Sequence, residues 1–163
     1  MVGDIERYEL ERRKSVRNIR IADHMLTVTY LLVNDPKLLV AVMENTFLAM
    51  TQAMGALLHY ERLYKRVPPF YNNFESKFNI FKERCIRKHS LDPGYLLMMQ
   101  NLKEFLMEHR KSPVEFSRGG RFVVCNDSYK MKTISIVEMK KNVERAKVFI
   151  AHVLSIIHKY KDG

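Results

Sequence analysis

The sequence predicts an all-α protein, an up-and-down helical bundle of about five helices with a short β-hairpin before the last helix. Three observations support this fold class. Apolar residues recur at spacings of three and four over long segments, as they do on the buried face of an amphipathic helix. The breaks between these segments are short and hold proline or capping residues, which favours antiparallel neighbours. One stretch, about 116–134, differs because it combines a Gly-Gly pair with a run of β-forming residues.

Composition and charge limit the class of protein. The chain has 163 residues, 47% of them hydrophobic and 28% charged, which indicates a single folded domain over 1–163. Its first residues are charged, and its longest uncharged stretch, 45–60, is shorter than the roughly 20 residues of a membrane span. With only Cys85 and Cys125 present, a disulfide framework is not expected. We therefore expect a cytoplasmic protein that does not bind a membrane.

The first two predicted helices form a long pair. The first runs from about Asp4 to Val33, and the second begins at Pro36, after the capping residue Asp35, and ends at about Arg66. The second helix has two apolar faces, one of large residues (Met43, Phe47, Met50, Met54, Leu57, Leu58) and one of small residues (Ala49, Ala53, Ala56). Two such faces need contacts on two sides, either in the centre of a bundle or across a dimer. We expect a homodimer.

The remaining helices follow breaks that carry capping signals. Asn72 and Glu75 have the spacing of a capping box for the third helix, and Asp92 is placed to cap the fourth. Ser135 and Glu138 repeat the capping-box spacing at the start of the last helix. The segment between the fourth and last helices differs in composition from the predicted helices.

Residues 110–132 carry six basic and two acidic side chains, and residues 70–163 hold most of the formal net charge of +10. Arg118 and Arg121 flank Gly119-Gly120, the predicted hairpin tip, and Lys130 and Lys132 would return on the second strand with their side chains on one face. A basic hairpin on a helical scaffold favours contact with a phosphate backbone. The predicted phosphate-binding residues are Arg110, Lys111, Arg118, Arg121, Lys130 and Lys132.

Common enzyme signatures are absent from the sequence. The six histidines are dispersed without metal-ligand spacing, and there is no Gly-rich phosphate loop or Ser nucleophile motif. We expect neither a metal nor a cofactor. On the first helix, a basic stripe at spacings of three and four indicates either a phosphate-binding groove or an ordinary solvated face; it consists of Arg13, Arg17, Arg20 and His24.

Two short patterns stand out, Phe74-x-x-x-Phe78 and Leu102-x-x-Phe105-Leu106-x-x-x-Arg110-Lys-Ser-Pro-Val-Glu-Phe116. Together with the helix order, they resemble HEPN-domain proteins. The resemblance implies a helical bundle, and active members are metal-independent ribonucleases in which two protomers bring an Arg and a nearby His to a shared cleft. Three pairs have a matching spacing: Arg84/His89, Arg17/His24 and Arg145/His152. The best candidate catalytic pair is Arg84 and His89, at a helix end where His89 would equally complement the helix dipole.

The resemblance would place the family motif after Arg110, but no histidine follows it there. We therefore expect a HEPN-like protein that binds nucleic acid or nucleotides, such as RNA or another phosphate-bearing ligand, without strong sequence specificity. One alternative is a metal-independent ribonuclease using the Arg/His pair. The other, which the resemblance implies, is a protein-binding module that partners a nucleotidyltransferase.

Overall fold

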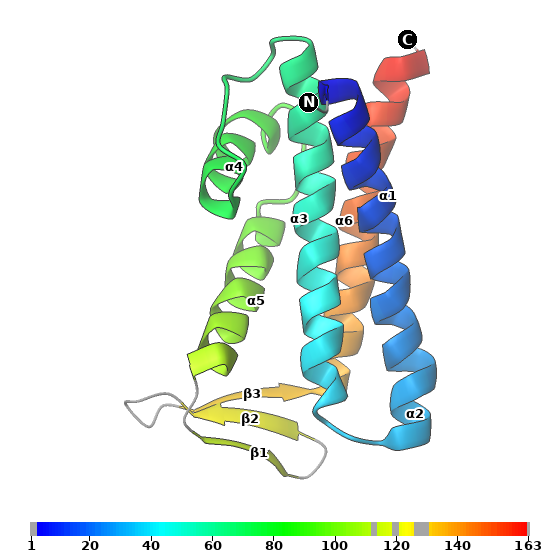
Figure 1. Cartoon of the computed structure of the whole chain (residues 1–163), viewed down its shortest axis with the longest axis vertical. Coiled ribbons are helices and arrows are strands. Elements are labelled where there is room, and N and C mark those ends of the chain that lie inside the picture. The colour runs from blue at the N-terminus through cyan, green and yellow to red at the C-terminus, as the bar shows by residue number, and fades with distance from the viewer. Residues whose placement is uncertain (1–2, 112–113, 119–120, 126–130, 163) are drawn as a thin grey trace.

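The computed structural model describes residues 3–111, 114–118, 121–125 and 131–162. Long helices stand side by side, a small sheet lies across one end of the bundle, and both termini lie at the other end (Figure 1). The all-α bundle with strands before its last helix confirms the predicted fold class. None of the helices in the described ranges combines the length and apolar character needed to cross a membrane.

The first helical stretch matches its predicted limits, although it is not a regular α-helix throughout. α1 (Asp4–His24) continues through a π-helical segment, η1 (Met25–Thr29), into the short α2 (Tyr30–Val33). It ends at Asn34, whose φ of 54° is the left-handed conformation that commonly stops a helix. The Asp35 carboxylate accepts a hydrogen bond from the Lys37 amide at 3.0 Å, just before α3 begins.

α3 (Leu38–Leu63) is the central helix of the bundle. It contacts α1 most extensively, and also α6, α5 and α4. Its small-residue face lies against α1, where the Ser15 hydroxyl donates to the Ala49 carbonyl at 2.6 Å. Both apolar faces of α3 are therefore covered within one chain, as expected for the centre of a bundle. They no longer require a dimer, so the homodimer stays a prediction that another surface would have to support.

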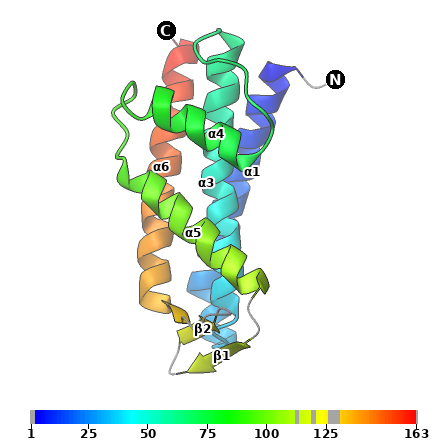
Figure 2. The same cartoon turned by 90° about the vertical axis from the view of Figure 1, so that its left-hand side faces the viewer.

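The third and fourth predicted helices pack across α3 and α6 as a separate layer (Figure 2). α4 (Phe74–Ile80) continues into the π-helical η2 (Phe81–Cys85), and α5 (Gly94–Lys111) follows a turn. The cap of α4 is Asn73, which accepts from the Ser76 amide at 2.8 Å, so the predicted start at Asn72 was one residue early. The predicted cap at Asp92 is confirmed by its 2.8 Å hydrogen bond from the Gly94 amide.

The predicted hairpin is part of a three-stranded antiparallel sheet. β1 (Val114–Arg118) and β2 (Arg121–Cys125) form the hairpin, and β3 (Met131–Ser135) adds a strand in the order β1-β2-β3. Phe122, Val124 and Ile134 are buried in the bundle core, so one face of the sheet closes the end of the bundle. α6 (Ile136–Asp162) starts directly after β3, and the Ser135 hydroxyl accepts from the Glu138 amide at 3.2 Å, which confirms the predicted cap.

Candidate nucleic-acid interface

The sheet places two arginines opposite each other at the end of the hairpin. In the register of β1 and β2, Arg118 pairs with Arg121, and Arg121 is exposed. Strand alternation puts Arg121 on the face opposite the buried Phe122 and Val124, away from the core. Like charges directly across a strand pair are destabilising. A bound anion would remove that cost.

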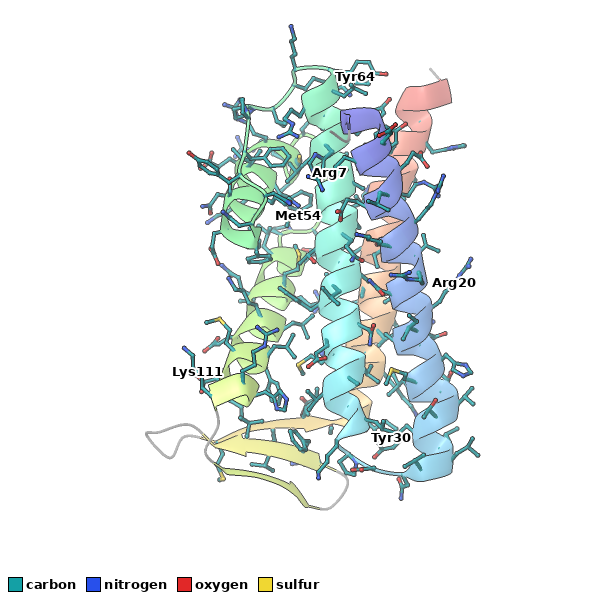
Figure 3. The ribbon with its side chains drawn as sticks, in the orientation of Figure 1. Arg7, Arg20, Tyr30, Met54, Tyr64 and Lys111 are labelled. Atoms are coloured by element: carbon teal, nitrogen blue, oxygen red, sulfur yellow. The ribbon has the colours of Figure 1, made fainter. Side chains whose placement is uncertain are left out.

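Two further predicted cations lie next to the sheet. Arg110 and Lys111 are exposed in the last turn of α5, immediately before β1. Figure 3 shows Lys111 at the sheet end of α5. Both residues also complement the negative end of the helix dipole, so their position has a structural reason as well as a functional one.

Lys132 does not belong to the same surface as Arg121. It pairs with Val124 in the register of β2 and β3, so it lies on the sheet face that meets the bundle. There its ammonium group is 2.7 Å from the Glu104 carboxylate of α5. The expected place of Lys132 on the second strand of the hairpin is therefore wrong, because the residue lies on β3, whose alternation turns it toward the bundle. Lys130 lies outside the described residues.

A cleft of about 350 Å³ opens between α5, α6 and β3, beside the sheet. Its floor includes Met98, Leu102 and Phe105, all buried. Its polar lining comes from Asn101, Thr133, Glu138, Asn142 and Arg145. Sequence reasoning missed this α5–α6 cleft, because its lining residues come from four elements, Met43 of α3 included, and form no local motif.

The two residues of the predicted pair, Arg84 and His89, lie in different environments. Arg84 is exposed on η2, whereas the His89 side chain is nearly buried in the turn that follows. The Nε2 of His89 lies 2.9 Å from Oε1 of Glu61 at the end of α3. The carboxylate can only accept, so His89 donates through Nε2. His89 and His152 line one cavity, and Arg84 does not line it.

Glu61 makes ionic contacts with three basic side chains at the end of α3. Its side chain is 1% exposed, and its second oxygen accepts from Arg66 Nε at 2.6 Å and from Lys88 Nζ at 3.2 Å. Burial alone would raise the pKa of the carboxyl group, but the hydrogen bonds from His89, Arg66 and Lys88 outweigh burial and lower the pKa to about 2. Glu61 is the only acidic residue between Glu44 and Glu75, a signal that sequence reasoning did not use.

The basic stripe of α1 is an exposed surface, which both of its sequence interpretations expect. Arg13, Arg17, Arg20 and His24 are all exposed, and they line a shallow groove of about 540 Å³ with Val16 and Ile21. Arg20 points away from the bundle (Figure 3). The stripe is on a side of the molecule distinct from the α5–α6 cleft.

In the described part of the chain, no three His, Cys, Asp or Glu side chains gather in a way that would hold a metal ion. Comparison with models of known protein families and with curated protein sequences finds no match. The function must therefore be inferred from the residues themselves.

Proposed function

We propose that this protein binds nucleic acid or nucleotides through their phosphates, without strong sequence specificity, as a HEPN-like protein would. The observation that supports the proposal best is the cross-strand pair Arg118 and Arg121 at the end of the β1–β2 hairpin. Arg110 and Lys111 add two exposed cations where α5 leads into β1. Such a cluster costs electrostatic energy on its own, and it releases counterions when it neutralises a polyphosphate.

The α5–α6 cleft supports the same proposal. It lies beside the sheet, and its volume of about 350 Å³ falls within the usual range for a ligand site. The side-chain amides of Asn101 and Asn142 are suited to hydrogen-bond the edge of a base, and the apolar floor would cover its face.

The proposal is tested by fluorescence anisotropy with labelled single-stranded RNA and DNA over a range of salt concentrations. The Arg118→Ala/Arg121→Ala variant should bind more weakly, and the log–log salt slope should flatten by about 1.4 for two lost contacts. The matched control is Lys140→Ala/Lys141→Ala, which removes the same charge from an exposed part of α6. Equal affinity and equal slope in both variants would contradict the proposal and favour the protein-binding alternative.

The ribonuclease alternative has one observation in its favour, because the Glu61 carboxylate fixes the imidazole of His89 in a cavity that also holds His152. The wild-type protein should nevertheless leave labelled RNA intact after incubation without metal, since the exposed Arg84 does not join this cavity. Cleavage that disappears in His152→Ala, a change at an exposed residue, would show that the enzyme interpretation is correct.

A further inference from the structure

A cavity of about 310 Å³ lies where the turn after η2 meets α6. The turn contributes Lys88, His89 and Ser90, and α6 contributes His152, Ser155, Ile156 and Lys159. The connection between α4 and α5 runs beside α6 in the half of the bundle away from the sheet (Figure 2). Along α6, Ser155 is about 28 Å from the helix start at β3. This cavity is therefore separate from the proposed nucleic-acid interface.

The lining of the His89/His152 cavity favours an anion. Six of its seven described lining residues carry an ammonium, imidazole or hydroxyl group, and none of the seven carries a carboxylate. Glu61 contacts two of the lining residues, and its two oxygens already accept from His89, Arg66 and Lys88. Around the cavity, the three described cations Arg66, Lys88 and Lys159 outnumber the one anion Glu61. The charge of these groups is therefore positive even when both histidines are neutral.

The turn that forms one wall is held in a fixed shape. The His89 amide donates to the Cys85 carbonyl at 3.0 Å, and its imidazole is held by Glu61. Ser90, which is exposed, has a φ of 53°, a left-handed conformation that a side chain other than Gly or Asn rarely adopts. The opposite wall is a regular stretch of α6. A binding site with two rigid walls needs little reorganisation when a ligand enters.

We infer that the His89/His152 cavity binds a phosphomonoester group. Such a group carries a charge of about −1.5 to −2 near neutral pH and presents three acceptor oxygens. The cavity offers matching donors: the ammonium groups of Lys88 and Lys159, and the hydroxyl of Ser90. The imidazole of His152, which is exposed on α6, supplies a further donor. The group would come either from a free phosphate ester or from the 5′-terminal phosphate of a nucleic acid.

The probe for the first experiment is inorganic phosphate, titrated into the ¹⁵N-labelled full chain against a sodium chloride control of equal ionic strength. Backbone amides of Ser90, His152 and Ser155 should shift with one saturable curve. In His152→Ala/Lys159→Ala the affinity should fall about tenfold, as expected when hydrogen bonds to a charged group are lost. Lys140→Ala/Lys141→Ala, on the same helix but outside the cavity, should bind as the wild type does.

Ser90→Gly separates a binding role from a structural one. Glycine adopts a positive φ without strain, so the thermal midpoint should not fall, whereas phosphate affinity should decrease because a donor is lost. A phosphate affinity unchanged in both Ser90→Gly and His152→Ala/Lys159→Ala would overturn the inference, as would the absence of a saturable shift at the cavity residues in millimolar phosphate.

A second experiment distinguishes the source of the phosphate group. A 5′-phosphorylated oligonucleotide and its 5′-hydroxyl counterpart are each tested for competition with inorganic phosphate; preference for the first identifies a nucleic-acid end, and equal competition identifies a free phosphate ester. The Arg118→Ala/Arg121→Ala variant should bind inorganic phosphate normally. Failure at the cavity is therefore distinguishable from failure of the proposed sheet interface.

Discussion

Glu61 is a buried carboxylate that holds three basic side chains from two segments of the chain. It joins the end of α3 to Arg66 just beyond that helix and to Lys88 and His89 in the turn before α5. The same contacts that form one wall of the His89/His152 cavity thus also stabilise the packing of that turn on the bundle. Binding and stability are therefore coupled at this position.

The Glu61→Gln variant should lose about 2–3 kcal/mol of unfolding free energy at pH 7, because the amide cannot replace the ionic hydrogen bonds. The folded pKa of about 2 lies below the ordinary value near 4.3, so the carboxylate stabilises the native state above about pH 4.3. That stabilisation is lost as the pH falls from there through 2. Denaturant unfolding of both proteins should therefore show a difference that shrinks between pH 5 and about 2.

The matched control is Glu75→Gln, which breaks an ion pair with Lys103 at a carboxylate that is 68% exposed. Exposed pairs of this kind contribute about 1 kcal/mol or less, so the change in unfolding free energy should be small at every pH. Equal losses in the two variants would show that Glu61 is not the organising charge that its contacts indicate.

Cys85 should be chemically inert in the folded protein. Burial, followed by the nearby negative charge of Glu61, raises the pKa of its thiol to about 12, so little thiolate exists at neutral pH. In a Cys125→Ser background, a thiol reagent at pH 8 should react with Cys85 only after guanidinium is added. Rapid reaction of the native protein, followed by absorbance, would mean that the η2 region opens readily.

The helices were predictable because the signals that mark them are local. The structure confirms the apolar periodicity of α3, the break at Asn34–Pro36 before it, and the caps of α5 and α6 at Asp92 and Ser135. The inward turn of Lys132 and the pairing of His89 with Glu61 depend on contacts between distant segments. No local pattern encodes such contacts. Sequence reasoning therefore located the helices and the basic hairpin, but not the partners that define each site.

Gly55 lies buried in the middle of α3, where glycine costs conformational entropy. A Cβ at this position would meet Glu11 Oε2 and Lys77 Nζ at 3.6 Å, an ordinary contact distance. Gly55→Ala should therefore stabilise the protein by about 0.5–1 kcal/mol in denaturant unfolding. Gly94→Ala is the control, because its Cβ would lie 3.1 Å from Asp92 Oδ1 and should give no gain. A loss in Gly55→Ala would show that the α1–α3 contact is too tight for a methyl group.

At the scale of the whole molecule, α2 forms an exposed apolar tip. Leu31, Leu32 and Val33 of α2 are 69%, 82% and 59% exposed, at the end of the bundle that holds the sheet. The basic stripe of α1 ends at His24, several residues before this apolar tip. With both faces of α3 covered, the apolar tip is the surface on which the predicted homodimer would form.

We therefore expect light scattering to give about twice the chain mass of 19.3 kDa at micromolar concentration. High salt should leave the dimer intact, because apolar burial is not screened. Leu31→Glu/Leu32→Glu should return a monomer, and the control Leu48→Glu, at an exposed position of α3, should not. A wild-type mass near 19.3 kDa would contradict the dimer, and with it a ribonuclease cleft shared between two protomers.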